Sequence, residues 1–431
     1  MLDVLKIAGR NLSRYRRRTL LTLLLIIIGM VAVLLFIAVT GSFKTMMVGQ
    51  ITDSVLGHVQ VHRKGYVASI DTLPLNLNVK PGAVAKVEEV LKQDRAVETW
   101  SPRVKFGGMF SNFSETTSIR INGVDPVREA ATVPLLPGRM LEGPKTGPLV
   151  EKGQIVIPML LSRGMKVALG DTVVVVATNR DGSVNGKTFV IRAITEAISG
   201  PGGRDGYIHI DDARELLRMK DAEVSEIAIR LKDPAQLPRV TAALKEALGA
   251  TSGKAPEPTP GKTPGGAGAG DGKPALEVHT WADLSPFASL ASMIDLMTVF
   301  IKVVLVSIVL VSVMNVMVMA VYERIREIGT IAAIGTRPSR ILSLFLAEGL
   351  LLGVIGTALG TLISLAAIYA LNLWQPHFAF GQQQDLVMAP TIATLQVVTV
   401  ALLVVGVAVL ASLQPAWKAS RLDPIDALRH V

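Results

Sequence analysis

Four long apolar stretches constrain the fold of this 431-residue chain more than any other feature of its sequence. A membrane-spanning helix needs about 20 predominantly apolar residues. The stretches lie within residues 20–41, 293–322, 341–373 and 391–414, and the first contains no charged residue. The first stretch also exceeds the roughly 7–15 apolar residues of a signal peptide, and no small-residue cleavage site follows it. The sequence therefore predicts an α-helical membrane protein with four transmembrane helices, all of them retained.

The composition agrees with this class. Charged residues make up 18% of the chain, whereas soluble domains contain about 25%. Half of the residues are hydrophobic, and the mean hydropathy is +0.45. The chain has no Cys, which excludes a disulfide scaffold, thiolate metal ligands and a cysteine nucleophile.

The net charge of +9 would by itself fit either nucleic acid or a membrane surface. Three short segments beside the spans, 1–19, 322–340 and 415–431, together hold 13 Lys and Arg but five Asp and Glu, whereas the loop 374–390 holds no Lys or Arg. The positive-inside rule places these three segments, and hence both termini, in the cytoplasm. We therefore predict a multi-pass protein of the cytoplasmic (inner) membrane with residues 42–292 outside. Its basic segments would meet anionic lipid, and nucleic acid is not expected as a partner.

The outer segment 42–292 alternates strand and helix signals, which predicts a large extracytoplasmic α+β domain. Strands are predicted at 57–62, 172–178, 187–194, 207–210, 224–231 and 276–280, and helices at 83–94 and 235–248. Asp181 and Gly182 predict a hairpin turn between two of the strands. Half of residues 249–274 are Gly or Pro, and such a chain cannot bury enough surface to offset its ordering entropy. We predict a flexible insertion there.

No motif for catalysis, cofactor binding or metal binding stands out. A phosphate-binding loop needs G-x-x-x-x-G-K-[ST], and the Gly-Lys pairs at 186–187, 261–262 and 272–273 all depart from this pattern. His58 and His62 lie in a predicted strand, where their spacing puts them about 13 Å apart. We predict that both are solvent-facing residues and not metal ligands. The chain is therefore expected not to be an enzyme and to hold no cofactor or metal itself.

Two cytoplasmic segments carry amphipathic helix patterns. In residues 1–19, apolar residues recur on one face and basic residues on the other, which predicts a helix lying along the membrane. Around residues 321–332 an apolar stripe continues from the second span, and charged residues cover the remaining faces. We therefore predict that the second span continues as a helix into the cytoplasm and that Gly335 and Pro338 end it.

The third span combines small residues with one acidic residue. Its small face comprises Gly349, Gly353, Gly356 and Gly360. Small residues at this spacing let helices approach closely in lipid, so we assign these glycines to helix packing. Glu348 lies at the cytoplasmic end of the span, where we expect it to face water or Arg337 and Arg340.

Three motifs resemble those of MacB/FtsX-type ABC transporter permeases, the type VII class. The first comprises E-R-I-R-E-I-G at 323–329, A-I-G at 333–335 and F-L-A-E-G at 345–349. The second is the ending P-A-W-K-A-S-R-L-D-P-I-D-A-L-R at 415–429, and the third is R-T-L-L-T at 18–22. The resemblance therefore spans the whole membrane part of the chain.

The resemblance implies a permease subunit that works with a separate MacB/LolD-like ATPase, which would bind the ATP and Mg²⁺. Two permease copies, identical or paralogous, would form the complex. Segment 323–340 would be the coupling helix and loop that contact the ATPase. The residues that match this element are Glu323, Arg324, Arg326, Glu327, Gly329 and Gly335. The outer segment would be a MacB-type periplasmic core domain with a second subdomain inserted at about 110–220.

Within this family the layout is most similar to LolC/LolE-type lipoprotein-releasing permeases, because no ATPase is fused to the chain. Residues 57–62 (G-H-V-Q-V-H) are also similar to this group. We therefore expect an amphiphilic substrate such as a lipoprotein, released or exported from the membrane. MacB-like export of peptides or drugs and FtsX-like transmembrane control of an outer enzyme are the alternatives. The turn 179–186 is shorter than the hook loop with which LolC recruits its chaperone, which argues against chaperone recruitment by this chain.

Overall fold

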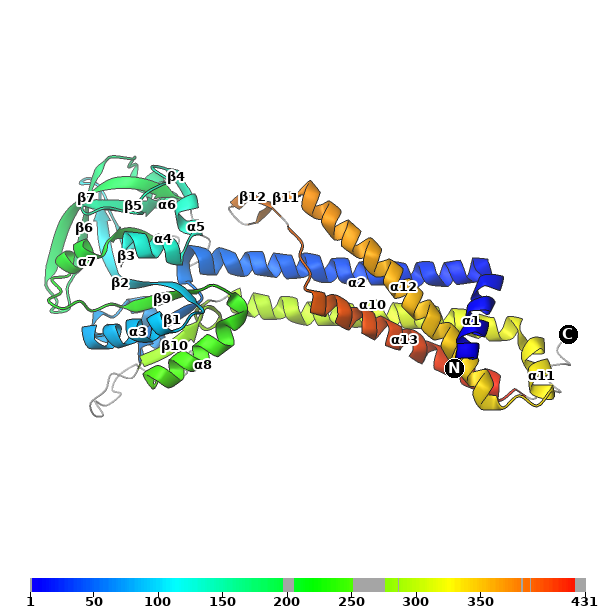
Figure 1. Ribbon diagram of the computed structural model, residues 1–431. Coiled ribbons are helices and arrows are strands. Elements are labelled where there is room, and N and C mark those ends of the chain that lie inside the picture. Colours follow the sequence, from blue (N-terminus) through cyan, green and yellow to red (C-terminus); the bar gives the residue numbers. More distant parts are fainter. Residues whose placement is uncertain are drawn as a thin grey trace, which may run out of the picture. The chain divides into compact units, whose positions relative to one another are not determined.

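The computed structural model describes residues 2–196, 205–250, 276–285, 287–380, 383–387 and 389–422. The chain divides into two compact units (Figure 1). The helical unit comprises Met1–Thr45 and Ala291–Val431, and the sheet unit comprises Met46–Leu290. All but the first two residues of the insertion predicted at 249–274 lie outside the described residues, as does the end of the predicted tail.

Among the described residues, four helices are long and apolar enough to cross a membrane, as the sequence predicts. They are α2 (Arg16–Ile51), α10 (Phe287–Glu323), α12 (Pro338–Trp374) and α13 (Thr394–Ser420). The described part of the helical unit also contains α1 (Leu2–Arg14), α11 (Ile325–Ala333) and a hairpin of β11 (His377–Phe380) and β12 (Gln383–Val387). The predicted outer loop 374–390 therefore contains a small two-stranded sheet.

Two helices extend beyond the predicted spans. α2 continues past residue 41 to Ile51, because no Pro or polar cluster interrupts the helix there. α13 continues past residue 414 to Ser420, with Pro415 inside it. A proline removes one backbone donor, but helices packed in a membrane tolerate the loss because neighbouring groups satisfy the freed carbonyl. The first residues of the predicted cytoplasmic tail are therefore helical.

The second span is followed by further helix that ends before Gly335, as predicted, but the helix is broken at Arg324. α10 ends at Glu323, and Arg324 leaves helical geometry with φ −115° and ψ 19° before α11 begins. α11 then ends at Ala333, and Gly335 adopts φ +93°, a conformation that glycine reaches without steric cost. Pro338 lies in the first turn of α12, where its missing N–H is harmless.

The sheet unit is built on one ten-stranded sheet (Figure 1). Its strands are β1 (Val59–Arg63), β2 (Val97–Ser111), β3 (Thr116–Val124), β4 (Met140–Glu142), β5 (Gln154–Pro158), β6 (Thr172–Thr178), β7 (Val184–Thr195), β8 (Asp205–His209), β9 (Glu226–Leu231) and β10 (Leu276–Thr280). The strand order is β10-β1-β9-β2-β3-β8-β5-β7-β4, and β6 pairs with β2 and β7. The main helices are α3 (Pro81–Gln93), α4 (Pro126–Thr132), α5 (Leu135–Gly138), α6 (Met159–Met165), α7 (Ile210–Leu216), α8 (Leu237–Leu248) and α9 (Trp281–Leu284).

Three hydrophobic clusters of described residues lie along this sheet, and the long strand β2 contributes to two of them. One cluster draws on β1, β9, β10, α3 and α8, which come from both ends of the unit's sequence. Another draws on β3, β5, β6, β7, α6 and α7, and its members run from Val104 to Leu217. The sheet unit is one compact unit, so the separate subdomain expected at about 110–220 stays a prediction.

The sequence misjudges the surroundings of β1. His58 and His62 were expected to face solvent, but they are 5% and 0% exposed. β1 lies between β9 and β10, so it is an interior strand. Residues 59–62 are all buried, so both faces of β1 are covered. The alternation of polar and apolar residues in β1 therefore marks a polar buried layer and not a solvated face.

Candidate ATPase-coupling site

α11 presents one buried and one exposed side. Ile328 and Gly329 are buried, whereas Glu323, Arg326 and Glu327 are exposed. A helix of this kind keeps its apolar stripe against the bundle and its charged side exposed. Exposed carboxylates and guanidinium groups on one short helix can form ion pairs with a second protein.

Arg324 and Gly329 do not belong to the exposed side, although the sequence groups them with it. Arg324 is 6% exposed, because the break between α10 and α11 turns its side chain into the bundle. Its Nη1 donates to Oε1 of Glu348 at 2.9 Å. Gly329 is buried on the packed side of α11.

Glu348 faces the interior of the bundle, so the expectation that it meets water, Arg337 or Arg340 is wrong. It is 1% exposed and pairs with Arg324. Asn11 of α1 donates from Nδ2 to the same Oε1 at 2.7 Å. One carboxylate oxygen therefore joins α1, α12 and the α10–α11 junction.

Two further contacts attach α1 to this junction. The guanidinium carbon of Arg324 lies 4.5 Å from the centroid of the Tyr15 ring, which is a favourable cation–π geometry. Arg14 and Glu327 form an exposed ion pair at 3.7 Å. α1 also packs along α12. α1 is thus held against the α10–α11 junction by side-chain contacts.

The four glycines of α12 lie where other helices approach. An added Cβ would come closer than 3.0 Å to Ser412 at Gly349, to Ala408 at Gly353, to Ile26 at Gly356 and to Met30 at Gly360. Two of these neighbours lie on α13 and two on α2. Their backbones can approach α12 closely because glycine has no side chain.

A second buried charge group, which the sequence did not suggest, lies in the sheet unit. Arg103 is 2% exposed and binds Glu129 through Nε at 3.0 Å and Nη2 at 2.7 Å. Its Nη1 donates to Glu226 at 2.9 Å. Lys105 Nζ lies 2.8 Å from the same oxygen of Glu226, and His62 Nε2 lies 3.5 Å from the other. The sequence signal was a pair of basic residues inside a strand that is otherwise rich in buried positions.

The charges in this group support one another. Burial would raise the pKa of Glu226, but Lys105, His62 and Arg103 hold it well below its usual range. Burial opposes the charge on Arg103, yet Glu129 and Glu226 raise its pKa above the ordinary value, so the guanidinium stays charged. For His62, burial lowers the pKa more than Glu226 raises it.

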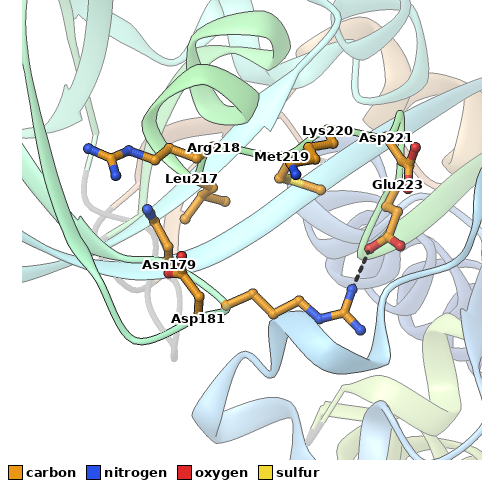
Figure 2. Close-up of a pocket in the computed structure, with 9 residues that line it drawn as sticks. Asn179, Asp181, Leu217, Arg218, Met219, Lys220, Asp221 and Glu223 are labelled. Carbon is orange, nitrogen blue, oxygen red and sulfur yellow. Dashed lines mark ion pairs between the residues drawn. The ribbon is translucent and has the colours of Figure 1, made fainter.

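A surface hollow of about 460 Å³ adjoins the β6–β7 turn (Figure 2). Asn179 and Asp181 of the turn line one side, and residues 217–221 line the other. Arg180 forms an ion pair with Glu223 at 3.6 Å. The predicted hairpin is present, and Gly182 adopts φ +85° in its turn. The hollow is open and carries both charge signs, which does not single out a ligand.

In the described part of the chain, no group of three or more His, Asp or Glu side chains has a geometry that could hold a metal ion. Of the Gly-Lys pairs tested as phosphate loops, Gly186-Lys187 lies in β7. Lys187 there forms an ion pair with Asp212 at 2.8 Å.

Two protein-family models match different parts of the chain. The family model for the MacB-like periplasmic core domain matches residues 19–247, which is more than half of the chain. The model for the FtsX-like permease C-terminal region matches residues 299–424.

Three relatives illustrate the range of the family. The lipoprotein-releasing system transmembrane protein LolC of Neisseria meningitidis is 22% identical over 430 residues, covering 96% of this chain and 94% of LolC. The ABC transporter permease YtrF of Bacillus subtilis is 35% identical over 116 residues, covering 26% of this chain and 27% of YtrF. The macrolide export ATP-binding/permease protein MacB of Escherichia coli K12 is 38% identical over 110 residues, covering 25% of this chain and 15% of MacB. The chain belongs to the MacB/FtsX family of ABC transporter permeases, which are membrane proteins with a MacB-like extracytoplasmic domain.

Proposed function

We propose that this chain is the non-catalytic permease subunit of a transporter whose separate ATPase hydrolyses ATP with Mg²⁺. The observation that supports this role is the form of the α10–α11 junction: Glu323, at the end of α10, and Arg326 and Glu327 of α11 are exposed, while Ile328 of α11 is buried. The buried Arg324–Glu348 pair ties α11 to α12, and Asn11 ties α1 to the same carboxylate. A push on α11 would therefore move several helices together.

We further propose that the substrate is a lipoprotein, released from the outer face of the cytoplasmic membrane. The similarity to LolC supports this choice, because it extends over 96% of this chain. The similarity to MacB covers 25% of this chain, which gives macrolide-like or peptide export less support. FtsX-like control of an outer enzyme is the remaining alternative.

The orientation that this function needs has both termini in the cytoplasm and the sheet unit outside. The distribution of Lys and Arg supports it. Because the chain has no Cys, single cysteines can be introduced without background labelling. A cysteine at Arg180 is expected to react with a membrane-impermeant maleimide on intact spheroplasts, and a cysteine at Arg326 only after lysis. The reverse pattern would contradict the orientation.

Reconstitution tests the function itself. The full chain is placed in proteoliposomes with a LolD-like ATPase, and ATP-dependent release of a fluorescent triacylated lipoprotein is measured together with phosphate production. The complex is expected to do both, and the chain without the ATPase to do neither. ATP hydrolysis by the purified chain alone would overturn the assignment. ATP-driven uptake of a macrolide or peptide without lipoprotein release would replace the substrate class.

Two substitutions test the coupling surface in the same assay. Glu323→Lys reverses an exposed charge, and Gly335→Pro blocks the φ of +93° that ends α11. Both are expected to keep ATP hydrolysis but lose most lipoprotein release. Arg17→Gln removes one exposed charge from α2 and serves as the matched control. Unchanged release in both coupling variants would show that α11 does not transmit the movement.

A further inference from the structure

The C-terminal end of α2 is built unlike a simple helix end. α2 runs to Ile51 and is followed by one π-helical turn, Thr52–Leu56. Gly57 closes this turn through a hydrogen bond from its N–H to the Thr52 carbonyl at 2.9 Å. π turns are rare and are frequent at functional sites, because they force a local change in helix geometry. The chain leaves the turn through Gly57, which has φ +72°. A Cβ atom added to Gly57 would lie 3.0 Å from the carbonyl oxygen of Ile229.

Three arginines from different elements hold this end. Arg139, after α5, donates to the side chain of Gln50. Arg103 of β2 donates from Nη1 to the Val55 carbonyl at 2.7 Å. Arg230 of β9 donates from Nη1 to Asp53 Oδ1 at 2.5 Å, and its Nε binds Glu98. All of these residues belong to the sheet unit, so the contacts lie within one compact body.

Backbone contacts reinforce the arginines. His58 N–H donates to the Ile229 carbonyl at 2.8 Å, and Gln60 Nε2 donates to the Leu56 carbonyl at 2.7 Å. Arg103 is itself fixed by two buried carboxylates, those of Glu129 and Glu226. A guanidinium held bidentately by one carboxylate has little freedom to reorient. Residues 50–56 are therefore held by the guanidinium groups of Arg103, Arg139 and Arg230. We call these three side chains the socket.

The chain returns toward the second span through a different kind of connection. β10 ends at Thr280, and α9 begins with a capping box between Thr280 and Asp283. α9 ends at Leu284, and Ser285 is extended, with φ −106° and ψ 129°, before α10 begins at Phe287. Helical hydrogen bonding is therefore interrupted here, whereas α2 enters the socket as a continuous helix.

We propose that Arg103, Arg139 and Arg230 are positioning residues that fix the end of α2 in the sheet unit, so that α2 is the connection that carries movement to the extracytoplasmic domain. The proposal rests on the proposed function, because it concerns how movement produced by the ATPase reaches that domain. The break in the helix at Ser285 lets the connection between β10 and α10 bend, whereas the end of α2 stays fixed in the sheet unit. The socket thereby determines which of the two helices moves the domain.

Amide hydrogen exchange of the full chain in nanodiscs tests the socket without using transport. The variants are Arg230→Gln, Arg139→Gln and their combination, and Arg239→Gln is the matched control. Arg239 forms an Arg–Asp pair with Asp94 at 3.0 Å in the same unit. The double variant is expected to speed exchange in residues 46–56 by about tenfold or more, the size expected for losing charge-assisted hydrogen bonds. The control is expected to leave these residues unchanged.

Arg103→Gln is the stronger variant but threatens folding, so Arg103→Lys is measured beside it as the charge-conserving form. Unchanged exchange in residues 46–56 in both the double variant and Arg103→Lys would overturn the socket. This result is independent of transport and separates failure of the socket from failure of the proposed function.

A transport readout then tests the second half of the proposal. In proteoliposomes with the ATPase, the double variant is expected to hydrolyse ATP at the wild-type rate while lipoprotein release falls at least about fivefold, as for a loss of coupling. If the double variant exchanges faster in residues 46–56 but releases lipoprotein at the wild-type rate, α2 does not carry the movement. If wild type itself releases nothing, the proposed function fails and the exchange experiment still decides on the socket.

Discussion

Arg324 in the helical unit and Arg103 in the sheet unit are both buried and both bind carboxylates, but they differ in the number of their partners. Arg103 binds two carboxylates and a backbone carbonyl. Arg324 binds one carboxylate. An arginine with one carboxylate partner loses fewer charge-assisted hydrogen bonds on changing partners than an arginine with two carboxylates and a carbonyl. We infer from this comparison that the Arg324 site, the proposed coupling end of the chain, can rearrange while the socket holds.

Removal of Arg103 should have the largest effect. Arg103→Leu removes the guanidinium that binds Glu129 and leaves Glu226 with Lys105 and His62, and an uncompensated buried charge costs about 3–5 kcal/mol. The free energy of unfolding, measured by denaturant titration of the full chain in detergent, is expected to fall by this amount. Arg239→Gln, in an exposed pair, is expected to cost at most about 1 kcal/mol. Equal losses in the two variants would remove the distinction between a locked and a surface arginine.

The Arg324 site should respond less in stability and more in function. In Glu348→Gln an acceptor oxygen remains for Asn11, and Arg324 keeps the Tyr15 ring, so we expect a loss of about 1–3 kcal/mol. ATP hydrolysis with the partner should continue while substrate release falls. Restoration of release by the exchanged pair Arg324→Glu with Glu348→Arg would show that the pair itself carries the coupling. A destabilisation as large as that of Arg103→Leu would contradict the comparison.

Disrupting the packing of α12 should lower the stability by a similar or smaller amount than removing the charge of Glu348. A Cβ on Gly356 would lie 2.7 Å from Ile26, so Gly356→Leu forces α12 and α2 apart at a cost of about 1–3 kcal/mol. Gly406→Ala on α13 is the control, because an added Cβ meets nothing within 4 Å there. The thermal unfolding midpoint is expected to fall in the first variant only. A midpoint unaffected by Gly356→Leu would show that close approach at this glycine is not required.

The smallest effect concerns pH. Burial lowers the pKa of His62 below the value of about 6.5 of an unfolded histidine. As the pH falls through 6.5, the unfolded chain binds a proton that the folded chain does not, so stability decreases on acidification. His62→Phe should reduce the fall in thermal midpoint between about pH 8 and pH 5.5. An unaltered pH dependence in His62→Phe would assign the effect to other groups.

Local patterns were enough to predict the membrane helices and several turns. Uncharged runs identify the four spans because the bilayer excludes charge. Asp181 and Gly182 predict the β6–β7 turn, and Gly335 predicts the end of α11, because each sets backbone geometry within a few residues.

Long-range pairing was not predictable from one sequence. Glu348 lies 24 positions from Arg324, and Glu226 lies 123 positions from Arg103. Nothing near Arg324 marks it as buried, because its motif neighbours Glu323 and Arg326 are exposed. His62 was misplaced for the same reason, since the strands that cover it come from distant parts of the sequence.

One measurement tests the central claim that the coupling end rearranges while the socket holds. Amide hydrogen exchange is recorded on the full chain assembled with its ATPase in nanodiscs, with and without ATP. The account predicts that ATP changes exchange in residues 321–335, around Arg324, and leaves residues 46–56 equally protected. Loss of protection in residues 46–56 with no change around Arg324 would contradict it.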